Sequence, residues 1–302
     1  MPPALRGCVV AIGNFDGVHR GHRAVIARAM AKAASLGKPC AVLTFEPHPS
    51  DFFAKSHVIF RLTPQDAKAV CLERLGLDGV IVLAFDAAMA SLTADAFVTD
   101  VLVARLGISA VVAGYDFHFG KAREGTPAFL ERAGQRHGFA VEIVERIGQD
   151  GAGSLEAVSS TATREALARG DVAKARALLG HDYFILGTVQ HGKKLGRTLG
   201  FPTANIALDA SCRLAPAIYA VRVRFEDREF GGVASYGHRP TFEPGAALLE
   251  VMLFDFSGDL YGRQLEVAFV EWIRPELKFD GVGALVKQMA MDVARAQEIL
   301  AG

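Results

Sequence analysis

Two histidines near the start of the chain lie in a pattern that suits phosphate binding. His19 and His22 belong to the segment GNFDGVHRGH at residues 13–22, which follows an apolar run and precedes an Ala-rich stretch with helical spacing. A helix that begins after a buried strand presents backbone N–H groups and the positive end of its dipole to an anion. Gly17 and Gly21 let the backbone approach such a ligand, and imidazole donors stabilise charge on a leaving pyrophosphate. The alternative is that both histidines only cap the helix and face solvent.

Two further segments carry side chains suited to a nucleotide or to a flat ring. Residues 158–164 (VSSTATR) combine hydroxyls, helix-end amides and an arginine that binds phosphate in a forked geometry, with an ordinary N-cap as the alternative. Residues 114–120 (GYDFHFG) place Phe117 and Phe119 beside Asp116, which suits a planar ring with N–H donors. The alternative there is a turn with two phenylalanines in the core.

The second half contains a long basic segment rich in glycine at residues 187–206. Two lysines and Arg197 lie among its glycines, as in loops that wrap phosphates. Thr203 and Asn205 are two residues apart, so on an extended segment they share one face and present oxygens to a hard cation. A basic surface hairpin is the alternative.

The elements that must position these residues alternate between strands and helices in the first half. Strand–helix alternation is typical of a parallel sheet covered on both faces. Apolar runs predict strands at residues 8–13, 40–45, 80–83, 110–113 and 141–144. Helical spacing and caps predict helices at residues 22–36, 64–75, 93–106 and 164–179, and another that begins at residue 127.

The pattern changes after Tyr183. Short β-rich segments follow, separated by turns, which predicts a compact antiparallel barrel or sandwich. These segments lie at residues 185–189, 218–225, 231–234, 248–254 and 264–272. The chain ends in an amphipathic helix predicted at residues 284–300. We therefore predict two domains, residues 1–183 and residues 184–302.

Composition narrows the class of protein. The chain has 302 residues with 33 basic and 33 acidic side chains, which disfavours bulk electrostatic binding of nucleic acid. Its four cysteines form no zinc or disulfide pattern, and no apolar run approaches the length of a membrane span. We expect a cytoplasmic protein, a monomer or weak homo-oligomer, with small-molecule ligands and neither a nucleic-acid nor a membrane partner.

Four motifs, taken in order, resemble those of the prokaryotic bifunctional riboflavin kinase/FMN adenylyltransferase family, also known as FAD synthetase. They are GNFDGVHRGH, TFEPHP at residues 44–49, GYDFHFG and SSTATR, and the segment at residues 196–206 (GRTLGFPTANI) resembles the flavokinase signature. The resemblance implies an α/β protein with an N-terminal Rossmann-like nucleotidyltransferase domain and a C-terminal antiparallel β-barrel flavokinase domain with a terminal helix. The implied reactions convert riboflavin to FMN and FMN to FAD, with ATP and Mg²⁺.

The same resemblance implies roles for particular residues. In the adenylyltransferase, ATP would contact Gly13, Phe15, Asp16, Gly17, His19, Gly21, His22, Ser160, Thr161 and Arg164, of which His19, His22 and Arg164 are catalytic. Its flavin would contact Pro47, His48, Asp116, Phe117, Phe119 and Gly120. In the kinase, ATP would contact Gly192, Gly196, Arg197, Gly200, Pro202, Thr203 and Asn205, with Mg²⁺ on Thr203 and Asn205. Flavin would contact Arg274 and Phe279, and Glu250 is the implied base, whereas without the resemblance it is an ordinary outward-facing strand residue.

The second half departs from the family pattern at several positions. Ser235 and Tyr236 stand where Asn and Ile are usual, Met252 replaces a histidine two residues after Glu250, and Ala217 replaces a glycine. One alternative is therefore an FMN adenylyltransferase whose barrel only binds or senses flavin. Another is a nucleotidyltransferase for a different phosphorylated acceptor, which the flavokinase signature disfavours.

Overall fold

The chain packs as two units, which are described separately. The computed structural model describes residues 2–55, 59–146, 158–192, 199–238 and 247–302. The first unit comprises Met1–Ile59 and Lys68–Ser159, and the second comprises Phe60–Ala67 and Ser160–Gly302. Each unit has its own apolar core.

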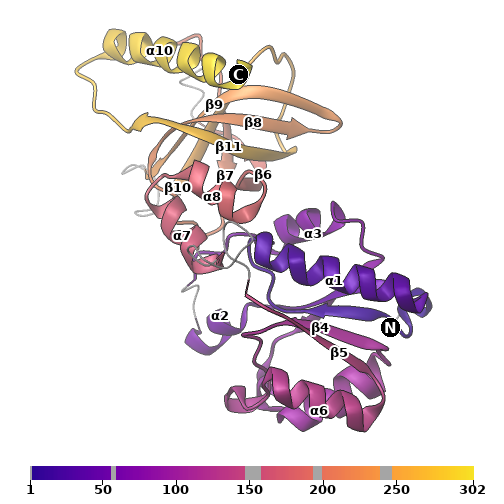
Figure 1. Cartoon of the computed structure of the whole chain (residues 1–302). Helices are drawn as coiled ribbons and strands as arrows, with labels where there is room; N and C mark the ends of the chain where they lie inside the picture. The colour runs from indigo at the N-terminus through magenta and orange to yellow at the C-terminus, as the bar shows by residue number, and fades with distance from the viewer. Residues whose placement is uncertain (1, 56–58, 147–157, 193–198, 239–246) are drawn as a thin grey trace. The chain divides into compact units, whose positions relative to one another are not determined.

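The first unit is built on a five-stranded parallel sheet in the order β3-β2-β1-β4-β5 (Figure 1). Every residue of the central strand β1 is buried, as expected for a strand paired on both sides and covered on both faces. β1 pairs with β2 on one side and with β4 on the other, so its carboxyl end is the switch point where open parallel sheets bind ligands. The strands are β1 (Val9–Ile12), β2 (Cys40–Glu46), β3 (Gly79–Ala84), β4 (Ala110–Gly114) and β5 (Ala140–Val144).

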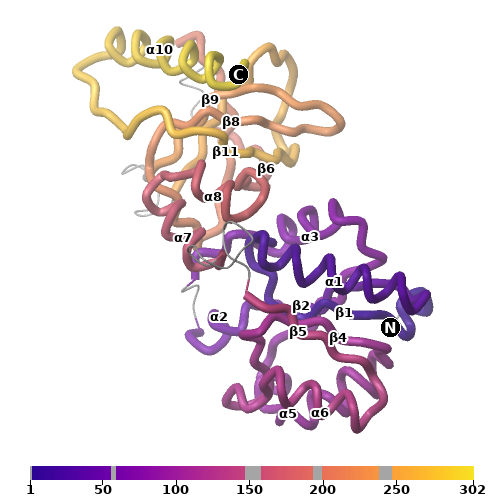
Figure 2. The backbone as a smooth tube through the Cα atoms, in the orientation of Figure 1, coloured from indigo at the N-terminus to yellow at the C-terminus, as the bar shows by residue number. Residues whose placement is uncertain are grey.

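Helices cover both faces of this sheet. Figures 1 and 2 show α1 (Arg20–Leu36) and α6 (Pro127–His137) on opposite sides of it. Gly37 ends α1 in the left-handed conformation with φ 60°, and the hydroxyl of Thr126 caps α6 by accepting from the N–H of Phe129 at 3.1 Å. The other helical segments before β5 are α2 (Pro49–Ala54), α3 (Gln65–Glu73), α4 (Ala87–Ser91), α5 (Ala94–Ala96), the π-helical η2 (Phe97–Arg105) and the 3₁₀ turns η1 (Pro3–Leu5) and η3 (Lys121–Arg123).

The second unit is built on a closed antiparallel barrel in the order β10-β7-β6-β11-β8-β9. Alternate residues of its strands point inward, and Leu249, Val251 and Leu253 of β10 are buried in the interior. α10 (Val282–Ala301) packs along β8, β9 and β11. The strands are β6 (Phe184–Gln190), β7 (Ala204–Ala207), β8 (Ala217–Phe225), β9 (Arg228–His238), β10 (Ala247–Leu253) and β11 (Gln264–Pro275).

Two helices that precede the barrel, α7 (Ser160–Ala168) and α8 (Val172–Leu179), share its apolar core. Phe60, from the first half of the sequence, belongs to this core too, and its ring meets Tyr183 edge-on at a centroid distance of 6.0 Å. Packing therefore groups the residues just before Tyr183 with the barrel. The predicted domain boundary at residue 183 stays a prediction.

The predicted strands and most predicted helices are confirmed, and the differences have local causes. The helix predicted at residues 164–179 is two helices, because Gly170 ends α7 in a left-handed conformation with φ 77° and Asp171 caps α8. The helix predicted at residues 93–106 begins as α5 and continues as the π-helical η2. The short elements α2, α4 and β7 were not predicted, because four to six residues carry little periodicity.

Within the parts of the chain that the structure describes, no helix combines the length and the apolar character needed to cross a bilayer.

Gly170 and Gly138 form a matched pair for testing the packing of α7 and α8 on the barrel. Their φ angles are 77° and 78°, but a Cβ at residue 170 would lie 2.7 Å from Cζ3 of Trp272, whereas nothing lies within 4 Å at residue 138. We expect Gly138→Ala to lower the free energy of unfolding by about 1 kcal/mol through backbone strain. Gly170→Ala should lower it by roughly 2–4 kcal/mol, since overpacking adds to the strain. Urea unfolding followed by far-UV circular dichroism, which reports on both units, measures both changes, and equal losses would contradict this packing.

Candidate active sites

The loop between β1 and α1 folds into a compact turn at the switch point of the sheet. Phe15, Gly17 and Val18 have positive φ angles of 51°, 86° and 41°, and the loop residues Phe15 to His19 are all buried. His19 is the N-cap of α1, and its Nδ1 accepts a hydrogen bond from the backbone N–H of His22 at 3.2 Å. The predicted strand–turn–helix arrangement is therefore confirmed.

The two predicted histidines lie together. The rings of His19 and His22 stack at a centroid distance of 3.6 Å, with 14° between their planes. Because Nδ1 of His19 is an acceptor, the neutral ring carries its proton on Nε2, which is then a donor. A Cβ at residue 21 would lie 3.1 Å from Cε1 of His19, so glycine at this position leaves room for the capping ring. The arrangement gathers helix-end amides and two imidazoles where an anion is stabilised.

The end of β2 lies beside this loop. The hydroxyl of Thr44 donates to the carbonyl of Asn14 at 3.1 Å, and Nζ of Lys68 lies 2.8 Å from Oε1 of Glu46. Of the two residues predicted to contact flavin here, Pro47 is exposed, whereas His48 is buried and caps α2 by accepting from the N–H of Ser50 at 3.2 Å.

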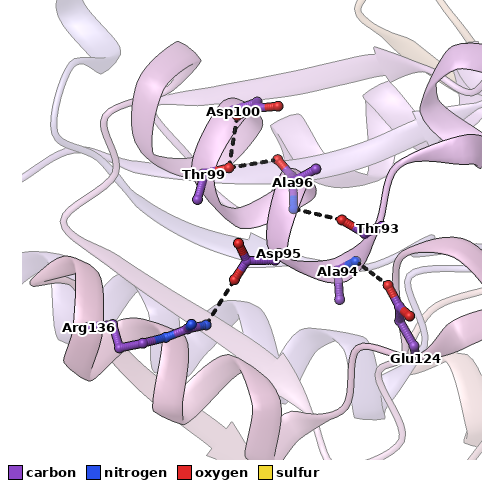
Figure 3. Close-up of polar contacts among 8 residues, drawn as sticks. All are labelled: Thr93, Ala94, Asp95, Ala96, Thr99, Asp100, Glu124 and Arg136. Carbon is purple, nitrogen blue, oxygen red and sulfur yellow. Dashed lines mark hydrogen bonds and ion pairs between the residues drawn. The ribbon is translucent and has the colours of Figure 1, made fainter.

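The loop that follows β4 is fixed against α5. A Cβ at Gly120 would lie 2.7 Å from the backbone nitrogen of Ala94, so the two backbones are in close contact. Figure 3 shows Glu124 accepting from that nitrogen, at 2.7 Å, and Thr93 capping α5 through the N–H of Ala96 at 3.1 Å. The loop is thus anchored at its far end by a short helix.

Two predicted flavin-binding rings in this loop have different surroundings. Phe117 and Phe119 stack at 5.5 Å, but Phe119 is 7% exposed and packs against Phe97 and Phe129, whereas Phe117 is half-buried. Asp116 is exposed at the turn. Phe117 and Asp116 are therefore the more accessible members of this predicted set.

The second predicted anion cluster begins α7. Ser160 is the first residue of that helix, Thr161 is exposed, and Nε of Arg164 donates to the carbonyl of Phe60 at 2.7 Å. All of these residues belong to the second unit. Their contact with ATP stays a prediction.

The outer wall of the barrel brings together two of the predicted kinase residues, Glu250 and Asn205. Glu250 of β10 is paired across the ladder with Asn205 of β7 on one side and with Ser235 of β9 on the other. Ala204 and Ile206 are buried while Thr203 and Asn205 are partly exposed, so the alternation places these two oxygen-bearing side chains outward, as predicted. Directly paired residues point to the same face, so Glu250 and Asn205 are neighbours there.

Backbone from the preceding loop approaches this pair closely. A Cβ at Gly192 would lie 2.7 Å from Cγ of Asn205, so glycine is required for the amide to occupy its position. Of the other predicted ATP ligands, Pro202 and Gly200 are exposed, whereas Gly196 and Arg197 fall outside the described residues.

Arg274, predicted to bind flavin, is engaged with the terminal helix. Its Nε and Nη2 donate to the two oxygens of Asp292 at 2.8 and 2.6 Å, and Gln288 donates to the same carboxylate at 3.0 Å. Asp292 is 4% exposed, and the Arg274 guanidinium lies 5.9 Å from the ring centroid of Phe279. This ion pair fastens α10 to β11, a role that the sequence did not reveal.

The four positions expected to differ from the family pattern lie on two different faces of the barrel wall. Ala217 and Tyr236 are fully buried in the barrel, and burial raises the pKa of the Tyr236 hydroxyl. Ser235 and Met252 are partly exposed on the wall that carries Glu250. Two of these four positions therefore belong to the core of the barrel, and the other two lie on its outer wall.

Comparison with known families matches both halves of the chain. The model described as FAD synthetase matches residues 1–162, and the model described as riboflavin kinase matches residues 179–300. A bifunctional riboflavin kinase/FMN adenylyltransferase from Haemophilus influenzae is 44% identical, over 97% of this chain and 94% of its own. The Pseudomonas fluorescens protein of the same description is 43% identical, over 99% and 95%.

A solved structure is similar over the same extent. The crystal structure described as a macrolide-efflux protein from Streptococcus pneumoniae superposes with a TM-score of 0.83 at 31% identity, covering 97% of this chain and 93% of that one. Since both halves match their family models and the relatives align nearly end to end, the chain belongs to the bifunctional riboflavin kinase/FMN adenylyltransferase family.

Proposed function

We propose that this chain makes FAD from riboflavin in two ATP-dependent steps. The barrel phosphorylates riboflavin to FMN, and the site after β1 transfers the adenylyl group of ATP to FMN. Membership of the family supports this assignment, as does the presence of the β1–α1 loop in the first unit and of Glu250 in the second.

In the adenylyl transfer, a phosphate oxygen of FMN attacks the α-phosphorus of ATP. The bond from that phosphorus to the bridging oxygen breaks, and pyrophosphate leaves. Such a reaction needs alignment and neutralisation of charge more than a covalent catalyst. His19, His22 and the first amides of α1 hold the phosphates, and Mg²⁺ bound with ATP supplies further neutralisation. Ser160, Thr161 and Arg164 are proposed as additional phosphate ligands, and the loop after β4 as the flavin contact.

In the kinase step, the ribityl 5′-hydroxyl attacks the γ-phosphorus of ATP and ADP leaves. Glu250 accepts the hydroxyl proton. Thr203 and Asn205 offer oxygens to the Mg²⁺ that accompanies ATP, which fits a cation that keeps most of its ligands as water and phosphate. Flavin contacts from Arg274 and Phe279 are part of the same proposal.

The observation that carries the proposal is the cross-strand pair of Glu250 and Asn205. A barrel that only sensed flavin would not need the Glu250 carboxylate beside the Asn205 amide. That amide in turn lies close to the backbone of Gly192. The deciding experiment supplies purified protein with riboflavin, Mg²⁺ and ATP and follows products by chromatography. We expect both FMN and FAD, and FAD formed only from added FMN would favour the sensing barrel.

His22→Ala tests the adenylyltransferase site. We expect FAD formation to fall by roughly 10²–10³-fold, since a positioned donor to the transferring phosphates is lost. FMN formation by the same molecules should be unchanged. His137→Ala, at an exposed position in the last turn of α6, is the matched control. Equal loss of both reactions would contradict two separate sites.

Glu250→Ala tests the kinase site. We expect FMN formation to fall by about 10²–10⁴-fold, the usual contribution of a general base, with adenylylation of added FMN retained. The control is Glu271→Ala, on β11, whose exposed carboxylate lies 3.6 Å from Arg295. A kinase rate at the wild-type level would remove Glu250 from its role.

Gly192→Ala tests the placement of the Asn205 amide. The added methyl group would overlap that amide, so we expect the KM of the kinase step for Mg-ATP to rise about tenfold while adenylylation is unaffected. Gly283→Ala, where nothing lies within 4 Å, serves as control. An unchanged KM would show that the loop does not position Asn205.

A further inference from the structure

Lys68 of α3 carries a buried charge that no step proposed above uses. Its side chain is 3% exposed, and its ammonium lies 2.8 Å from Oε1 of Glu46 and 3.4 Å from Oγ1 of Thr44. Both partners stand at the carboxyl end of β2. Removing an ammonium from water costs several kcal/mol, which the ion pair only partly offsets.

Through Thr44, the ammonium reaches the loop that holds His19. The Thr44 hydroxyl has one proton, which it donates to the carbonyl of Asn14 at 3.1 Å, so Lys68 is the donor to its oxygen. The N–H of Gly13 also donates to the carbonyl of Leu43, at 3.1 Å. Hydrogen bonds in such a chain polarise and strengthen one another. The first residues of the β1–α1 loop, Gly13 and Asn14, are therefore hydrogen-bonded to β2.

Through its ion pair with Glu46, the same ammonium is also linked to the segment that follows β2. Glu46 directly precedes Pro47 and His48, the segment proposed to lie near flavin. The ammonium of Lys68 is thus linked both to the β1–α1 loop, proposed to bind ATP, and to the segment after β2, proposed to lie near flavin.

We propose that Lys68 is a positioning residue of the adenylyltransferase site, which sets the β1–α1 loop and the segment after β2 at the spacing that adenylyl transfer requires. This inference rests on the proposed function. A buried ion pair stabilises a fold little compared with an apolar pair of the same volume, so a role in fixing geometry accounts for a charge at this buried position. Misplacement of a reacting group by about 1 Å is enough to lower a rate on the order of a hundredfold.

The experiment compares Lys68→Met with the double variant Lys68→Met/Glu46→Leu in the full chain. We expect both to lower kcat/KM for FMN adenylylation by roughly ten- to a hundredfold and to raise the KM values for ATP and FMN. The double variant should regain the thermal stability that the single one loses, because no charge is left buried. Riboflavin phosphorylation by the same molecules should be unchanged. Wild-type adenylylation in a stable double variant would overturn the inference.

A smaller change keeps the test decisive should the Lys68 variants fail to fold. Thr44→Val conserves shape but removes the hydroxyl that joins Lys68 to Asn14, so a raised KM for ATP supports the inference and an unchanged KM overturns it. The control is Arg136→Met, which breaks the exposed pair of Arg136 with Asp95, 3.0 Å long and drawn in Figure 3. A wild-type chain that forms no FAD would instead refute the proposed function itself.

Discussion

The hydrogen bond from the His22 backbone to the His19 ring is the interaction on which the first site depends. It satisfies one of the amides that a helix leaves open at its start, and it turns the imidazole of His19 inward over the first turn. The stacked ring of His22 and the glycine between them follow from that placement. Because the cap stands at the switch point of a buried parallel sheet, the helix end, the loop and the neighbouring strand ends meet in one place.

Much of this architecture could be predicted from patterning. A fully buried parallel strand such as β1 is a continuous apolar run, and α1 is bounded by a cap and by Gly37, so both were found nearly to the residue. The break between α7 and α8 was not predicted, because the sequence does not show whether a glycine within a helical pattern adopts the left-handed conformation that Gly170 has. β7 was missed because it owes its existence to pairing with β6 and β10, not to its own four residues.

The site was predictable only where its residues form a motif. His19 and His22 are close in sequence, and Thr203 and Asn205 share a face by alternation alone. Lys68 and Asp292 gave no signal, because a charged residue on a helix is ordinarily solvated. Only the structure, in which Lys68 pairs with Glu46 of β2 and Asp292 pairs with Arg274 of β11, shows that these charges are buried.

Glu250 lies on the outside of a closed barrel, so the chemistry proposed for it is separated from the interior of that barrel. The lumen is filled by side chains that alternate with the outward ones, and Tyr236 and Ala217 are fully buried in it, whereas Glu250 and Asn205 are paired on the outer face. Substitutions within the lumen can accumulate as long as their volumes compensate. The interior of the barrel can therefore be repacked for higher thermal stability without any change to the outward residues proposed to act in the kinase step.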